Sequence, residues 1–252
     1  VYPYQVLYDW FVYGDNDSMR LEYYIYPDHY EFVYENYNLT KDMITGFSER
    51  FGLYPFISEK YGHAQFVWGG GMEHQTISSL GSNSQYLIAH ELAHQWWGDM
   101  VTCANFHHIW LNEGFATYGQ AMWFEIRDSS MAALHEEMAK KANFAKLGSD
   151  GSGNGTIYVE DTTNVGNIFN GNLVYKKGAW VMHMLRHIVG DSAFFTGLQY
   201  YGEQFRFKTA VTEDFQAAME YVSGRNLSAY FERWIYGSNF PVYQLSTSYV
   251  EL

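Results

Sequence analysis

Hydrophobic and polar positions alternate strongly at the beginning of the chain. Residues 1–26 are rich in Tyr, Val and Phe, and the turn-like sequence GDNDS at 14–18 interrupts them, which predicts strands on either side of a turn. From Asp28 to about Phe51 the spacing becomes helical. The candidate buried stripe of this helix consists of Phe32, Tyr37, Ile44 and Phe47.

A second strand-like region precedes a strongly helical one. Strand-like pieces return at 53–80, and they include QFVW at 65–68, directly before three glycines. Ser82, Asn83 or Ser84 can cap the next helix, which carries QYLIAHELAHQWW until Gly98 ends it.

Helical periodicity dominates the remainder, and no internal repeat is present. Further helices are predicted at about 111–124, 130–147, 174–189, 191–205, 212–222 and 226–236. A β-rich beginning followed by helices indicates an α+β fold, with a small β-rich lobe containing one helix at 1–81 and a helical lobe at 82–252. We expect residues 1–252 to form a single domain.

Two segments raise separate questions. The Gly/Ser-rich sequence GSDGSGNG at 148–155 predicts a loop. Its Asp and Asn could ligate calcium, although the spacing does not match an EF-hand. The chain opens with VYPYQVLYDWFVY and closes with PVYQLSTSYVEL, which both read as strands cut off at their ends. We therefore expect a piece of a longer polypeptide whose flanking domains are missing.

Charge and composition exclude several classes of partner. Fifteen Lys and Arg residues against 28 Asp and Glu residues give a formal net charge of −13, which disfavours nucleic acids and anionic membranes as partners. No stretch of about 18 apolar residues predicts a membrane span. Cys103 is the only cysteine, so the chain cannot form an internal disulfide.

The sequence HELAH at 90–94 places an HExxH pattern within a helical segment. Residues four apart lie on one face of a helix, so His90 and His94 can reach the same ion. Glu91 lies beside the ligand direction and can act as the general base for a metal-activated water.

A third ligand is predicted on the following helix. Glu113, within WLNEGFATY, follows His94 after eighteen intervening residues. Two imidazoles and one carboxylate, with a fourth position left for water, are typical of catalytic zinc rather than structural zinc. The lone Cys103 cannot supply a thiolate set, which further favours one catalytic Zn²⁺.

Four motifs in order resemble those of the gluzincin aminopeptidases, the family of membrane alanyl aminopeptidase and leukotriene hydrolase. They are GGMEH at 70–74, HELAHQWWGD at 90–99, WLNEGFATY at 110–118 and VYKKGAW at 174–180. This resemblance implies a thermolysin-like zinc peptidase catalytic domain. It also implies an enzyme that removes N-terminal residues from peptides with a free N-terminus.

The resemblance assigns a role to each matching position. Glu73 would bind the α-amino group of the substrate, and Tyr175 would donate a hydrogen bond to the oxyanion of the tetrahedral intermediate. Gly70, Gly71, Met72 and His74 would belong to the substrate-binding edge strand, whose backbone pairs with the extended peptide.

The match departs from the family at two positions of the first motif. His74 stands where the family usually has Asn, which places a titratable ring near the substrate. Gly71 stands where Ala is common, and we expect this change to be minor. The resemblance also implies an N-terminal β-sandwich that supplies another acidic contact to the substrate amine, and we expect this chain to begin after it.

Two other functions compete with an aminopeptidase. A thermolysin-like zinc endopeptidase is favoured if the missing domain leaves the cleft open, and a catalytically weak peptide-binding module would require loss of the metal.

Asn112 and Asp99 are candidates for orienting a ligand imidazole. Acidity, aromatic richness and truncated ends suggest a secreted or cell-surface enzyme, although the family also has cytoplasmic members.

Overall fold

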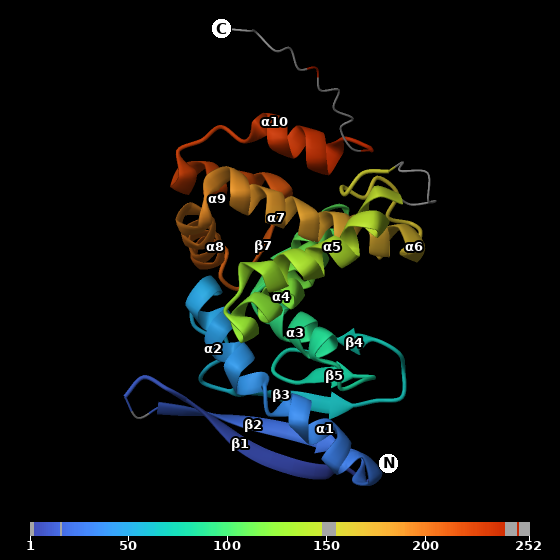
Figure 1. The fold of residues 1–252 in the computed structure, drawn as a ribbon, viewed down its shortest axis with the longest axis vertical. Helices are drawn as coiled ribbons and strands as arrows, with labels where there is room; N and C mark the ends of the chain where they lie inside the picture. The colour runs from blue at the N-terminus through green and yellow to red at the C-terminus, as the bar shows by residue number, and fades with distance from the viewer. Residues whose placement is uncertain (1–2, 16, 148–154, 240–245, 247–252) are drawn as a thin grey trace, which may run out of the picture.

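A five-stranded mixed sheet forms one end of the molecule (Figure 1). The computed structural model describes residues 3–15, 17–147, 155–239 and 246. The strand order is β1-β2-β3-β5-β4, in which β1/β2 and β4/β5 are antiparallel and the other pairs parallel. The strands are β1 (Gln5–Tyr13), β2 (Asp17–Ile25), β3 (Lys60–Gln65), β4 (Gly71–Met72) and β5 (Ser78–Leu80).

The predicted hairpin at the start of the chain is confirmed as β1 and β2, but the strand predicted at QFVW is wrong. Strand β3 ends at Gln65, and the side chains of Val67 and Trp68 are 69% and 74% exposed. The Phe66 N–H still donates to the Leu80 carbonyl, after which the glycines lead the chain into β4 at the sheet edge.

The single helix predicted from Asp28 to Phe51 is divided into η1 (Pro27–His29), α1 (Tyr30–Tyr37) and α2 (Thr40–Phe51). The division occurs where the Leu39 N–H donates to the Asn36 carbonyl in a tightened turn. Asn is a weak helix former because its side chain competes for backbone hydrogen bonds. Tyr37, Ile44 and Phe47 are fully buried, as expected of the stripe, whereas the Phe32 side chain lies outside the described part.

Helix α3 (Gln85–Ala93) begins as predicted and ends earlier. The Ser84 hydroxyl caps it by accepting a hydrogen bond from the Leu87 N–H. The helix stops at Ala93 instead of reaching Gly98, because the next N–H groups, those of Gln95 and Trp96, bond three residues back in a series of turns. Gly98 then adopts a φ of 150° and its N–H donates to the Val101 carbonyl.

Among the described residues after Gly98, the regular elements are helices apart from the small parallel pair β6 (Val101–Cys103) and β7 (Lys208–Ala210). Two predicted helices contain π-helical segments: the one at 174–189 is η3 followed by α7, and the one at 226–236 is α10 followed by η4. The elements are η2 (Phe106–His108), α4 (Trp110–Asp128), α5 (Met131–Leu147), α6 (Val165–Ile168), η3 (Gly171–Lys177), α7 (Gly178–Val189), α8 (Asp191–Gln204), α9 (Thr212–Ser223), α10 (Ser228–Phe231) and η4 (Glu232–Tyr236).

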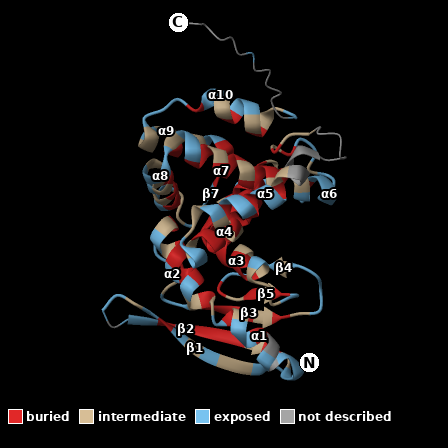
Figure 2. Cartoon of the chain, viewed as in Figure 1, coloured by how far each residue is buried: buried red, intermediate tan, exposed pale blue. Residues whose placement is uncertain are grey.

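Helix α4 is the centre of the core. Nearly every residue from Trp110 to Glu125 is buried, and a helix that is apolar on all sides is one that other elements surround. Helices α3 and α4 lie between the sheet and the remaining helices, and both contain a large share of buried residues (Figure 2). The α+β prediction, with a small sheet lobe followed by a helical lobe, is confirmed.

Two sequence predictions fall outside the described residues. Most of the proposed calcium loop at 148–155 and nearly all of the strand-like ending at 241–252 are not described. Among the residues that are described, no helix is both long and apolar enough to cross a membrane.

Candidate active site

His90, His94 and Glu113 converge on one point between α3 and α4. Nε2 of His90 lies 3.1 Å from Nε2 of His94, and Oε2 of Glu113 lies 3.4 Å and 3.3 Å from these two nitrogens. His94 and Glu113 are buried, and His90 is partly exposed. The HExxH helix and the glutamate of the following helix therefore present three ligand atoms to a common centre.

These three atoms fit a tetrahedral zinc ion. Zinc bonds of about 2.0–2.1 Å at tetrahedral angles place neighbouring ligand atoms roughly 3.3–3.4 Å apart, close to the observed separations. Oε2 of Glu113 is buried with no hydrogen bond from the described residues. A divalent cation would neutralise this carboxylate and separate the two imidazole nitrogens.

The electrostatics of the centre also require a positive charge. Burial lowers the pKa of His94, but the nearby Glu113 carboxylate outweighs burial and raises this pKa to about 10. Burial raises the pKa of Glu113, and His94 and His90 outweigh it and hold the pKa well below its usual range. In the absence of a metal, a proton on the His94 imidazole supplies positive charge beside this carboxylate.

A backbone carbonyl orients His94. Nδ1 of His94 donates to the Trp97 carbonyl at 2.9 Å, so Nε2 is the ring nitrogen that faces the centre and would bind an ion there. The turns that end α3 early create this contact. Asn112 accepts from the Cys103 N–H and Asp99 accepts from Gln95, and neither has a recorded hydrogen bond to a ligand imidazole.

Glu91 is buried beside the centre. Desolvation raises the pKa of its carboxyl group, while His90 and His94 partly counteract the rise. A carboxylate with a raised pKa is a better proton acceptor, as a general base requires.

Gly71 of the edge strand β4 faces Glu91 at close range. A Cβ atom built at Gly71 would lie 2.6 Å from Cδ of Glu91, so the Glu91 carboxylate would have to shift to admit a side chain there. The expectation that Gly in place of Ala is a minor change stays a prediction, because the atoms that a methyl group would meet belong to the flexible end of the Glu91 side chain. Glycine at this position gives Glu91 the space that its carboxylate occupies.

Tyr175 lies in the π-helical segment η3 on the other side of the centre. Its ring stacks on His90 with a centroid separation of 6.1 Å. Burial, followed by the charge and hydrogen bonding of Glu113, raises the pKa of its hydroxyl group, which therefore remains protonated. A protonated phenol can donate a hydrogen bond to developing negative charge.

A cavity of about 610 Å³ opens over these groups. Gly70, Gly71 and Glu73 line it, and carboxylate oxygens of Glu73 and Glu91 and a ring nitrogen of His94 lie within 4.8 Å of one another. Met72 and His74 are not among the lining residues, and His74 instead bonds to Ser79 at 3.0 Å.

Several lining residues were not singled out from the sequence. Thr117 belongs to the WLNEGFATY motif but was given no role there, and the others reach the cavity because of the packing of α3, α4 and α5: Tyr86, Gln120 and Lys141.

Gln95 was also missed, and it holds the turn after Glu73. Its Oε1 accepts from the Thr76 N–H at 2.9 Å, and Thr76 has a φ of 64°, which is unfavourable for a β-branched residue. The buried amide of Gln95 thereby stabilises the strained turn that follows Glu73.

Residues 72–234 match the peptidase family M1 domain. Aminopeptidase N from Lactococcus lactis subsp. cremoris is 33% identical over 175 residues, which are 68% of this chain and 20% of the relative. Glutamyl aminopeptidase from Bitis rhinoceros is 29% identical over 220 residues, 82% of this chain and 22% of that protein.

A solved structure shares the fold over almost the whole chain. An M1 zinc metallopeptidase from Deinococcus radiodurans, bound to a Tyr-Ser-Ala substrate, superposes with a TM-score of 0.75 at 26% identity. The match covers 95% of this chain and 53% of that one. The chain therefore spans about a fifth of the length of the curated relatives and about half of this solved chain.

Proposed function

The chain belongs to peptidase family M1, and on that premise we propose that it is the zinc-dependent catalytic part of an aminopeptidase. The observation that carries the proposal is the common centre of His90, His94 and Glu113, with ligand-atom separations of 3.1–3.4 Å. Zinc bound there would polarise the scissile carbonyl and lower the pKa of a water molecule towards about 7.

The protein's own groups would divide the remaining work. Glu91, buried beside the centre, would accept a proton from the attacking water and deliver it to the leaving amine. Tyr175 would keep its proton and donate a hydrogen bond to the oxyanion. The two groups belong to different elements around the same cavity, so attack and charge stabilisation can occur on one bound peptide.

Glu73 would make the enzyme an exopeptidase. Its carboxylate lines the cavity close to Glu91, where it can pair with the protonated α-amino group of a peptide. The glycines Gly70 and Gly71 before it leave backbone groups accessible at the sheet edge, where an extended peptide could pair. A peptide with a blocked N-terminus would lose the charge that Glu73 pairs with.

The proposal is tested with a panel of aminoacyl arylamides and matching N-acetylated substrates, each assayed with and without a chelator. We expect turnover of the free-amine substrates alone, and loss of this turnover on chelation. Glu91→Gln is the matched control, because it should keep the zinc and lose turnover by about 10²–10⁴-fold. Equal turnover of blocked and free substrates would instead indicate an endopeptidase, and zinc binding without turnover a binding module.

A further inference from the structure

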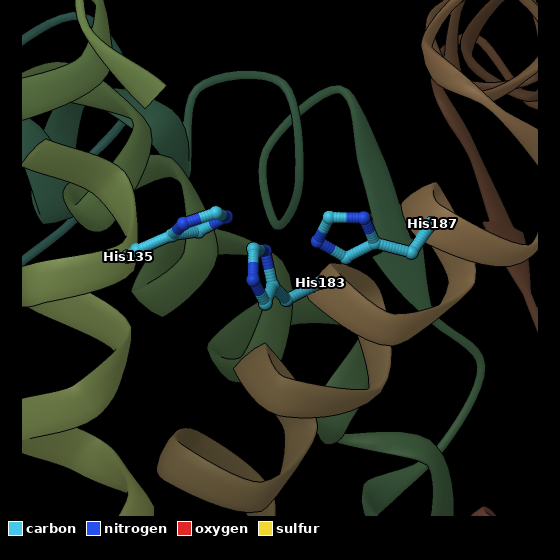
Figure 3. Close-up of side chains that lie close together, drawn as sticks. All are labelled: His135, His183 and His187. Carbon is cyan, nitrogen blue, oxygen red and sulfur yellow. The ribbon is translucent and has the colours of Figure 1, made fainter. Parts of the chain in front are cut away.

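Three histidines form a second cluster on the helical lobe, on residues that the proposed hydrolysis does not use. His183 and His187 lie four residues apart on α7, and His135 comes from α5. Their rings turn towards one another across the two helices, as Figure 3 shows. One ring nitrogen from each lies within 4.8 Å of those of the other two.

We propose that His135, His183 and His187 form a second metal site, which takes a divalent transition-metal ion of the zinc type. The i, i+4 spacing of His183 and His187 is the spacing that lets two imidazoles on one helix reach the same ion. The third imidazole comes from a neighbouring helix, as the third ligand of a metal site commonly does. Three neutral nitrogen donors suit Zn²⁺, Ni²⁺ or Cu²⁺ rather than Mg²⁺ or Ca²⁺.

The ring of His183 has an unmet bonding requirement. Its side chain is 5% exposed, and Nδ1 is buried with no hydrogen-bond partner among the described residues. A buried polar atom without a partner costs free energy, which an ion held at that nitrogen would recover. Burial, together with His187, His135 and Arg186, lowers the pKa of His183 to about 4, so the ring is a neutral ligand at pH 7.

The exposure of the other two histidines lets an ion reach the site and lets their side chains move towards it. His135 and His187 are exposed, so an ion can enter from solvent, and their side chains can rotate by the small amount that closes the set. The three ring nitrogens now lie at most 4.8 Å apart. Zinc requires ligand nitrogens roughly 3.3–3.4 Å apart, so rotation of the two exposed side chains has only a short distance to close.

The Arg186 guanidinium, whose charge acts on His183, does not oppose an ion there. Arg186, between the two α7 histidines in sequence, is engaged by the carboxylates of Glu125 and Asp191. Its charge is therefore compensated within the protein.

Such an ion would connect α5 to α7. Both helices pack against η3, the segment that carries Tyr175. The second ion would thus stabilise the surroundings of the first site without contacting its ligands. This role makes metal binding measurable as thermal stability, independently of any peptidase activity.

The test is a calorimetric titration of Zn²⁺ into protein that already holds one equivalent of zinc. We expect one further equivalent to bind, and the melting temperature to rise with it. His135→Gln and His187→Gln should each weaken this binding by about 100-fold or more, because even loss of a group that supports a ligand costs 10–100-fold. Both side chains are exposed, so both variants should fold.

His29→Gln is the matched control, because it removes an exposed histidine from the sheet lobe. It should retain the second equivalent and its effect on the melting temperature. Absence of a second equivalent in the unmodified protein would overturn the proposal. Unchanged zinc affinity in both cluster variants would also overturn it, because the second ion would then bind elsewhere.

Discussion

At the scale of single residues, the centre depends on atoms that approach one another closely. Gly71 and Glu91 illustrate this, since the absence of one side chain makes room for the other. The HExxH pattern predicts the ligands and the base, but it contains no information about the strand that packs over them. The close approach of Gly71 to Glu91 emerges only from the three-dimensional contact.

Gly71→Ala should impair catalysis more than stability. The added methyl group would displace the Glu91 carboxylate, and a misplacement of about 1 Å can cost on the order of 100-fold in rate. We expect kcat on an aminoacyl arylamide to fall by roughly that factor, with the zinc content unchanged. Gly52→Ala is a comparison at an open position, although its φ of 98° adds strain there. Full activity of Gly71→Ala would show that Glu91 can move freely.

Tyr175→Phe isolates the hydrogen bond from the aromatic ring. The phenyl ring can keep the stacking on His90 while the donor is lost. Removal of one oxyanion donor costs about 10²–10³-fold in kcat, and we expect a loss of this size with little change in KM. Measurement of kcat and KM separately checks this, and a loss confined to KM would place Tyr175 in ground-state binding instead.

At the scale of elements, an ionic cluster built on the buried Arg186–Glu125 pair joins three helices. Arg186 of α7 makes two parallel hydrogen bonds to Glu125 of α4, at 2.7 Å and 2.8 Å, and two more to Asp191 at the start of α8. Arginine suits this arrangement because its planar guanidinium group matches carboxylates in pairs. The cluster fixes α7 against the helix that provides Glu113.

Arg186→Met should therefore destabilise the fold strongly. Removing one partner of a buried ion pair costs about 3–5 kcal/mol, because the other charge stays buried without compensation. Chemical denaturation measures this change. A double variant that also carries Glu125→Leu should be less destabilised than Arg186→Met alone, and additive losses would argue against a direct pair.

At the scale of the whole molecule, sequence periodicity identified the hairpin, most of the helices and the α+β order. It failed where backbone hydrogen bonds depart from regular patterns. Helix α3 stops at Ala93 because the following N–H groups bond three residues back, and η3 is π-helical although its residues read as ordinary helix. Both departures occur beside the candidate centre, where a turn orients His94 and a π-helical segment carries Tyr175.

The candidate site likewise contains residues that the sequence predicted and residues that it did not. The fixed spacing of the HExxH pattern within one helix predicted His90, Glu91 and His94. The position of Glu113 on the following helix predicted the third ligand. The lining residues Tyr86 and Lys141 were not predicted, because only the packing of separate helices brings them to one cavity.

Stability should also depend on pH through the buried His63. Burial lowers the pKa of His63 to about 3. The unfolded chain binds a proton near pH 6.5 while the folded chain does not, so stability falls as the pH decreases from about 6.5 towards 3. This group contributes a slope of at most about 1.4 kcal/mol per pH unit.

His63→Gln removes that contribution. Between pH 6.5 and 5, the free energy of unfolding of the variant should depend on pH less steeply than that of the unmodified protein. Denaturation curves of both proteins at several pH values measure the two slopes. The metal ligands contribute equally to each slope, so their contribution cancels in the difference. Identical slopes would mean that His63 titrates normally in the folded state.

The central claim is that two imidazoles of α3 and one carboxylate of α4 share a zinc ion. Anomalous X-ray diffraction at the zinc absorption edge tests it directly on crystals of the zinc-loaded protein. The account predicts a peak about 2.0–2.2 Å from Nε2 of His90, Nε2 of His94 and a carboxylate oxygen of Glu113. No peak among these three residues, or a Glu113 side chain turned away from the ion, would contradict it.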